Sequence, residues 1–276
     1  MTRLFILPLI VLSVLFLNIN SQANVLVNDA GSNAGDEEPF TSAVVPSGSG
    51  QVGDYELIFC SILPDGPGIV YSDPTPGTWD TLNTGISGEG EIALGIWGRF
   101  TNNAASEDIS CNWNIVSAVF TTGSFRYNDV DPDNPIIAVA CNSGLTETAV
   151  APSVISEPGS QVVRIFASLF QSEFPPFAIH MSSNDEVSGS STSEANEGEG
   201  LLILEAKTQL FIVDAPTETG EDSVNLEQID FWRACTIAIR MAPTNVPTMN
   251  EWGLISFAAF AGIAGFWFLR RRQVTA

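Results

Sequence analysis

Three aspartates at alternate positions, Asp129, Asp131 and Asp133, are the residues whose spacing best fits a metal site. Oxygen ligands at alternate positions begin a calcium-binding loop, which also requires glycine at its sixth position and glutamate at its twelfth. Asn134 and Ala140 occupy those two positions here. Since Asp, Asn and Pro are also the ordinary residues of a tight turn, the segment predicts a turn, with a weak calcium site as the alternative.

Residues for nucleophilic catalysis are scarce. Such catalysis needs a base beside the nucleophile, and the single histidine, His180, ends an apolar stretch without a Gly-x-Ser-x-Gly elbow. Glycoside cleavage needs two carboxylates held across the substrate, and no pair is marked among the many carboxylates of this chain. The sequence therefore predicts a protein that is not an enzyme, with no catalytic residue assigned; a carbohydrate-active enzyme is the alternative.

Four cysteines lie in the middle of the chain: Cys60, Cys111, Cys141 and Cys235. An even number favours disulfides if the compartment is oxidising, whereas a chain with one histidine and no Cys-x-x-Cys motif is a poor candidate for zinc. Of the three pairings that four cysteines allow, the expected strand neighbours favour Cys60–Cys235 and Cys111–Cys141. Buried free thiols are the alternative, because cysteine packs well in cores.

Four tryptophans of the same region could stack on sugar rings if they reached the surface: Trp79, Trp97, Trp113 and Trp232. Each lies in a segment with an apolar pattern. We therefore predict that they pack in the core rather than form a binding platform.

The charge distribution excludes one class of partner. The chain has 32 acidic and 10 basic residues and a net charge of -22, and every acidic residue lies between Asn24 and Glu251. Phosphate binding depends on clustered Lys and Arg, so binding to nucleic acid is excluded. The basic residues of that stretch are Arg99, Arg126, Arg164, Lys207, Arg233 and Arg240.

The N-terminal segment has the three parts of a secretory signal. Arg3 supplies positive charge, Leu4 to Leu17 form an apolar run, and Ser21-Gln22-Ala23 provides small residues for signal peptidase. We expect residues 1–23 to be a signal peptide that is cleaved after Ala23.

The C-terminal segment predicts a membrane helix. Residues 253–269 are uncharged and would span roughly 25 Å as a helix, which is the short limit for crossing a bilayer. Arg270, Arg271 and Arg272 follow at once, and positive charge stays on the cytoplasmic side. The sequence predicts a linker with a sorting motif at 242–252, a transmembrane helix at 253–269 and a cytoplasmic basic tail at 270–276.

Residues 246–272 resemble the IPTL-CTERM sorting domain of Gram-negative envelope proteins. That pattern is Ile-Pro-Thr-Leu, a variable residue and Glu-Trp-Gly, followed by an apolar helix and basic residues. The resemblance implies recognition by an exosortase-type membrane enzyme that cleaves near the motif; a permanent one-helix anchor is the alternative. Pro247, Thr248, Glu251, Trp252 and Gly253 match the pattern, and Val246 and Met249 stand conservatively in place of its Ile and Leu.

The body, residues 24–241, shows apolar alternation with period two, interrupted by Pro and Gly turns. Many short strands of this kind predict an all-β domain, an antiparallel two-sheet sandwich of jelly-roll type. Its strands are expected near 41–46, 57–62, 78–83, 91–100, 109–120, 136–141, 163–169, 174–181, 200–213 and 235–241. Residues 184–200, rich in Ser, Gly and acid, are expected to form a mobile loop.

The body also resembles a jelly-roll-like β-sandwich module of bacterial and phage surface proteins. The resemblance rests on the turn Gly53-Asp54, the segment Pro76-Gly77-Thr78-Trp79, the element Tyr127 to Asp131 and a Trp-bearing strand at 232–241. It implies the fold and adds nothing about an activity.

These observations predict an exported protein of a Gram-negative envelope. It passes through an intermediate anchored in the inner membrane and reaches the cell surface or extracellular matrix. Its expected partners are signal peptidase, the exosortase-type enzyme and the inner membrane, and the sandwich is expected to contact a glycan or matrix component. No cofactor is expected apart from the calcium alternative.

Overall fold

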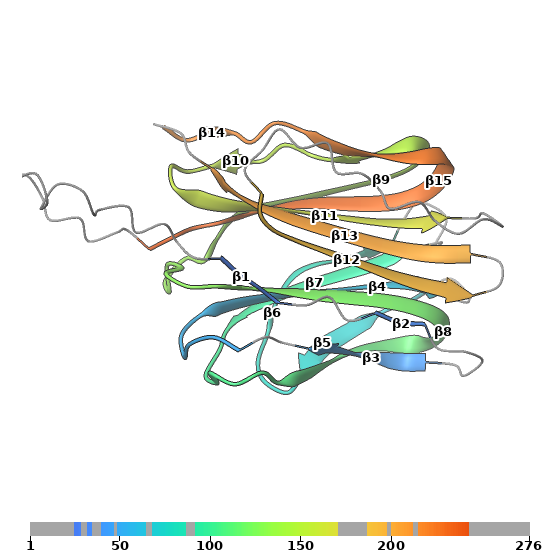
Figure 1. Cartoon of the computed structure of the whole chain (residues 1–276), viewed down its shortest axis with the longest axis horizontal. Helices are drawn as coiled ribbons and strands as arrows, with labels where there is room; N and C mark the ends of the chain where they lie inside the picture. The colour runs from blue at the N-terminus through green and yellow to red at the C-terminus, as the bar shows by residue number, and fades with distance from the viewer. Residues whose placement is uncertain are drawn as a thin grey trace, which may run out of the picture. The chain divides into compact units, whose positions relative to one another are not determined.

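The computed structural model describes residues 25–28, 32–34, 40–46, 49–64, 68–86, 92–170, 187–197, 200–211 and 215–242. In these residues every regular element is a β-strand (Figure 1), which confirms the all-β prediction. The chain divides into two compact units, Met1–Ala242 and Pro243–Ala276, and all described residues belong to the first.

The N-terminal half builds an eight-stranded antiparallel sheet around one long strand, β8. The central order is β1-β8-β4-β7-β6, and β2, β3 and β5 also pair with β8. The strands are β1 Val25–Asn28, β2 Ser32–Ala34, β3 Phe40–Pro46, β4 Tyr55–Pro64, β5 Tyr71–Thr75, β6 Asp80–Ile86, β7 Ala93–Phe100 and β8 Asp108–Tyr127.

The C-terminal half builds a five-stranded antiparallel sheet with the order β12-β13-β11-β15-β9. A separate pair, β10 with β14, completes the set of strands. The strands are β9 Ile136–Ala151, β10 Ile155–Ser156, β11 Ser160–Phe170, β12 Val187–Glu197, β13 Gly200–Phe211, β14 Thr217–Glu218 and β15 Asp222–Ile239.

The main core joins the two sheets face to face. Leu57 and Phe59 of β4 pack in one cluster with Leu94 of β7. Ile165 of β11 and Ile237 of β15 complete the cluster from the other sheet. These residues belong to the alternating sets of their strands, as the period-two pattern predicted. The described unit is thus β-sandwich-like.

A second core covers the opposite face of β4 and β7. Ile58 and Trp97 lie there against Val45 of β3 and Ile109 of β8. The first half of β8 pairs with β3 and β5, and its second half pairs with β4, so β8 passes from one layer to the next. Figure 1 shows β3 and β5 on the side of β4 and β7 that faces away from β11 and β13. Burial on both faces explains why β4 and β7 are apolar at consecutive positions.

The strand order departs from a jelly roll. A double-sheet jelly roll is made of two Greek keys whose strands interleave between the sheets, whereas here each large sheet takes its described strands from one half of the chain. The antiparallel pairing and the facing sheets agree with the prediction, but the jelly-roll connectivity does not occur among the described strands.

The predicted loop at 184–200 is also corrected. Residues 187–197 form β12, which pairs with β13 at the edge of its sheet. Backbone amides and carbonyls make these ladder hydrogen bonds whatever the side chains are. An edge strand therefore needs no apolar alternation of its own, and its composition resembled that of a loop. The predicted strand at 174–181, with His180, lies outside the described residues.

Candidate functional site

The disulfide joins Cys141 to Cys235, with 4.1 Å between their Cα atoms. The predicted pairs Cys60–Cys235 and Cys111–Cys141 are therefore wrong. Strands β9 and β15 are neighbours, and their register places Cys141 directly opposite Cys235. Cys60 lies in β4 of the other sheet, so it cannot reach Cys235 across the main core. In this structure Cys60 and Cys111 are buried and are not joined in a disulfide.

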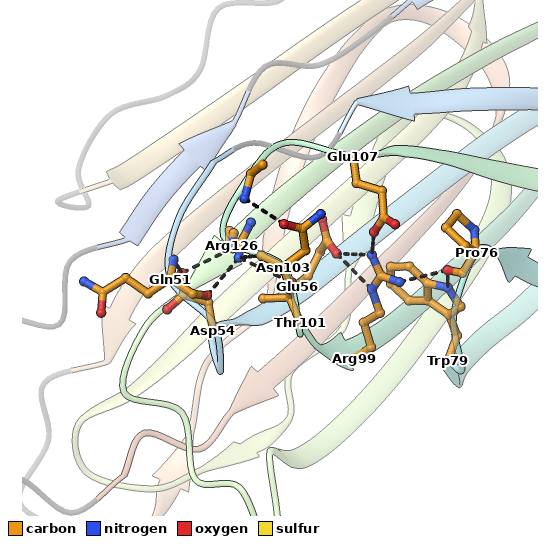
Figure 2. Close-up of polar contacts among 11 residues, drawn as sticks. Gln51, Asp54, Glu56, Pro76, Trp79, Arg99, Thr101, Asn103, Glu107 and Arg126 are labelled. Atoms are coloured by element: carbon orange, nitrogen blue, oxygen red, sulfur yellow. Dashed lines mark hydrogen bonds and ion pairs between the residues drawn. The ribbon is translucent and has the colours of Figure 1, made fainter.

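A row of charged side chains crosses three strands at one end of the second core (Figure 2). The register places Glu56 of β4 opposite Arg99 of β7 on one side and opposite Arg126 of β8 on the other. Glu56 and Arg126 are each 1% exposed, and Arg99 is 8% exposed. Burying a charge to this degree lowers the stability of the fold unless the charge is paired. The role of these residues therefore depends on their partners.

Arg126 fastens two loops to the sheet. Its Nε donates to Oδ2 of Asp54 at 3.2 Å, and its Nη2 donates to the carbonyls of Gln51 at 2.8 Å and Asn103 at 2.6 Å. The same carboxylate oxygen of Asp54 accepts the backbone N–H of Gln51 at 2.6 Å. Between these loops, the backbone of Thr101 exchanges hydrogen bonds with Gly53 and Asp54.

Arg99 fastens the next turn in the same manner. Its guanidinium donates to Glu56 at 3.0 Å, to Glu107 at 2.6 Å and to the carbonyl of Pro76 at 2.8 Å. It also lies over the ring of Trp79, 4.1 Å from the ring centroid, within the range of a cation–π contact. A Cβ added at Gly77, whose φ is +104°, would come within 2.4 Å of the guanidinium, so this turn needs glycine.

The polar cluster therefore acts as a structural anchor. It engages two of the segments on which the resemblance to a surface module rests, Gly53-Asp54 and Pro76 to Trp79, and holds both against buried arginines (Figure 2). The third segment is structural as well, because Val130 forms a β-bridge with Met241 and packs in the main core. These carboxylates are committed to arginine partners, which is unlike a pair facing a substrate.

The aspartates of the calcium hypothesis form a turn. Asp131 accepts the backbone N–H of Asp133 through its carboxylate at 3.0 Å, and its own N–H donates to the carbonyl of Arg240. Asp129 has a φ of +54°, which Asp tolerates better than most residues, and its carbonyl accepts the N–H of Ala242. Among the described residues, no three His, Cys, Asp or Glu side chains could hold one metal ion.

The tryptophan prediction is confirmed: Trp79, Trp97, Trp113 and Trp232 are all buried. Trp97 and Trp113 flank the ring of Tyr71 in edge-to-face contacts. Burial of the rings in the second and third cores accounts for all four positions without a ligand.

The other described arginines also bind within the unit. Arg164 donates to the carbonyl of Thr219 at 3.0 Å, and Arg233 of β15 reaches across to Asn83 of β6 at 2.9 Å. Arg240 and Glu157 form an ion pair at 2.7 Å. The guanidinium groups of these arginines are thus engaged in contacts within the unit, and the body keeps a large net negative charge.

Sequence reasoning missed the anchor, although a signal for it was present. Arg99 and Arg126 are two of the six basic residues of the body; Arg99 stands inside a strongly apolar strand, and Arg126 lies between Phe125 and Tyr127. An arginine in such a strand must find carboxylates or carbonyls, because it stays charged. That argument predicts that each arginine has such partners, but it does not say which of the 32 acidic residues they are.

The three tyrosines of the chain predict a pH dependence. Burial raises the pKa of Tyr55, Tyr71 and Tyr127 well above the ordinary value of 10.0, and the carboxylate of Asp80 adds to the effect at Tyr55. The unfolded chain loses these protons above pH 10, whereas the folded chain keeps them. Their contribution to stability is therefore complete below pH 10 and is lost as the pH rises from there toward the folded pKa.

We expect tyrosinate absorbance in an alkaline titration to rise only as tryptophan fluorescence reports unfolding. The same titration in denaturant is the control and should show ionisation near pH 10. Reversible ionisation near pH 10 in the folded protein would contradict the burial of these hydroxyls.

The remaining predicted sites lie outside the described residues: the signal peptide, the sorting motif at 246–253, the helix at 253–269 and the arginines at 270–272. No helix in the described part is long and apolar enough to cross a membrane. No protein-family model, curated protein or solved structure compared with this chain matches it.

Proposed function

We propose that this chain is an exported envelope protein of a Gram-negative bacterium, delivered by its two ends and used for contact by its middle. Signal peptidase removes residues 1–23, and the C-terminal helix holds the chain in the inner membrane. An exosortase-type enzyme then acts at the motif that begins at Val246. The two-sheet sandwich is displayed at the surface or in the matrix, where it contacts a glycan or matrix component without catalysis.

The Cys141–Cys235 disulfide is the observation that carries the export half of this proposal. It lies across two neighbouring strands, whose register places the two cysteines opposite one another. Disulfides persist in oxidising compartments and are rare in the cytosol. This agrees with a signal sequence at one end and positive charge after the last apolar segment at the other.

The packing of the described unit supports a role in contact. Buried arginines hold the loops at one end of the second core, and the main core fills the space between the sheets. Internal packing of this kind gives the body a fixed shape, which suits a module that is displayed outside the cell. Its acidic surface favours solubility and suppresses association with anionic polymers.

Processing at both ends is the first test. We expect intact-mass measurement of the surface form to show a chain that begins at Asn24 and ends near Pro247. Glu251→Ala/Trp252→Ala removes two motif residues while keeping the apolar segment, so this variant should accumulate in the inner membrane. Thr244→Ala/Asn245→Ala, next to the motif, is the matched control and should be processed normally. A surface form that retains Arg270 to Arg272 would leave only the permanent anchor.

Contact is tested with the processed form on an array of bacterial and matrix polysaccharides, with product release measured for every glycan that binds. We expect saturable binding without turnover. Turnover that is lost when one carboxylate is replaced, in a variant that still folds, would establish the alternative of a carbohydrate-active enzyme.

A further inference from the structure

The second core contains two thiols that face one another. Cys60 of β4 and Cys111 of the first half of β8 are both fully buried in the same cluster. Their side chains are in hydrogen-bond contact, and burial together with this contact raises the pKa of Cys60. The two residues come from different layers: β4 belongs to the layer shared by both cores, and the first half of β8 covers it.

On one side of the two thiols, strand pairing and a contact of Thr122 hold the two layers together. The β4–β8 register places Thr122 opposite Cys60. The hydroxyl of Thr122 lies 3.4 Å from the carbonyl of Val44, and the β3–β8 register places the residue before it, Ala43, opposite Cys111. The contact between Thr122 and Val44 therefore joins a residue paired with Cys60 to the neighbour of a residue paired with Cys111.

Tyr71 fixes the meeting point from the other side. It is paired with Trp113, two residues beyond Cys111 on the same face of β8, while its hydroxyl lies 3.1 Å from the carbonyl of Cys60. The Tyr71 ring also contacts Trp97 in β7. With contacts on both sides, the two layers cannot slide apart without breaking the core.

We propose that Cys60 and Cys111 form a second disulfide in the exported protein. The bond would join the layer of β3, β5 and the first half of β8 to strand β4, whereas Cys141–Cys235 lies within one sheet. Together the two bonds use all four cysteines. The proposal rests on the proposed function in one respect, because export supplies the oxidant.

The oxidant is a disulfide of an oxidising thiol–disulfide protein or of oxidised glutathione. The thiolate of one cysteine attacks it, which forms a mixed disulfide and releases one thiol. The second cysteine, as thiolate, then displaces the other sulfur, so two protein thiols become one disulfide and the oxidant gains two electrons and two protons. Because both thiols are buried in the finished fold, the exchange takes place before the second core closes.

Tryptic mapping tests the pairing directly, since cleavage after basic residues leaves each cysteine in a different peptide. The full chain is isolated from the envelope with free thiols alkylated, digested without reductant and analysed by mass spectrometry. We expect the peptide that ends at Arg99 to be linked to 100–126, and 127–164 to be linked to 234–240. Alkylated Cys60 and Cys111 in a chain whose Cys141–Cys235 bond is closed would overturn the proposal.

A refolding arm separates this inference from export. The full chain is reduced, unfolded and refolded in mild detergent with reduced and oxidised glutathione, where localisation plays no part. The same two links are expected, and closure of Cys141–Cys235 alone or a different pairing would overturn the proposal. If refolding gives both links but all four thiols of the cellular protein are reduced, the pairing holds and export is wrong.

Single variants are the control. Cys60→Ala should leave Cys111 open to alkylation once the chain is unfolded, and Cys111→Ala should do the same for Cys60. The Cys141–Cys235 link should persist in both.

Discussion

Replacing Arg126 by methionine is expected to lower the free energy of unfolding by about 3–5 kcal/mol, the usual cost of breaking a buried ion pair by removing one partner. Asp54, which is 4% exposed, would lose its guanidinium partner. The carbonyls of Gln51 and Asn103 would each lose one of their donors as well. Chemical denaturation of the variant and the parent measures the difference, and equal m-values would show that both unfold from equally compact states.

Arg240→Met is the matched control. Arg240 also pairs with a carboxylate, that of Glu157, at 2.7 Å, but the side chains are 29% and 40% exposed. Solvent screens this pair, so its loss should cost about 0–1 kcal/mol. A double-mutant cycle with Asp54→Asn isolates the coupling between Arg126 and Asp54. If Arg126→Met and Arg240→Met lowered the free energy of unfolding equally, burial of Arg126 would not determine how much it stabilises the fold.

The strands were the most predictable part of the fold, because side-chain alternation is set by the strand itself. On β11, Val163, Ile165 and Ala167 share the main core as their spacing predicted. On β4 the two alternating sets, Leu57 with Phe59 and Ile58 with Cys60, turned out to fill two different cores. The apolar content of both sets signalled burial on both faces, but it did not show what covers the second face.

Strand order was less predictable, because it depends on contacts between distant segments. The disulfide shows this: Cys141 and Cys235 are 94 residues apart, and only the pairing of β9 with β15 brings them together. The predicted pairs assumed different neighbours. The edge strand β12 is a second case, since the sequence of 187–197 resembles a loop and its pairing with β13 is made by the backbone.

The polar anchor could be predicted only in part, and for a physical reason. A charged residue in an apolar strand indicates that it has a polar partner. Which residue is the partner depends on the register between the paired strands. Glu56 meets Arg99 because β4 and β7 are paired so that these positions are opposite. A shift of one residue would turn the charge toward the main core. The turn motifs at 53–54 and 76–79 could be recognised in the sequence. That both turns bind a buried arginine could not be predicted from it.

Removing the Cys141–Cys235 disulfide should have the second large effect. The double variant Cys141→Ala/Cys235→Ala opens a loop closed over a separation of 94 residues. In the chain-entropy model a loop of this length contributes about 4–5 kcal/mol, because the bond restricts the unfolded chain. We expect the free energy of unfolding to fall by that order, with the strand register kept by the backbone ladder of β9 and β15.

Asn142→Ala is the matched control for the disulfide, because Asn142 is the exposed neighbour of Cys141 on the same strand. Its side chain accepts the backbone N–H of Ser143, the next residue, so the change should stay within about 0.5 kcal/mol, as for ordinary surface substitutions. Denaturation of both variants beside the parent gives the comparison. Since the entropic effect acts on the unfolded state, the double variant should also show a larger m-value as its unfolded chain expands. A loss below about 1 kcal/mol with an unchanged m-value would mean that the two strands hold the chain together without the bond.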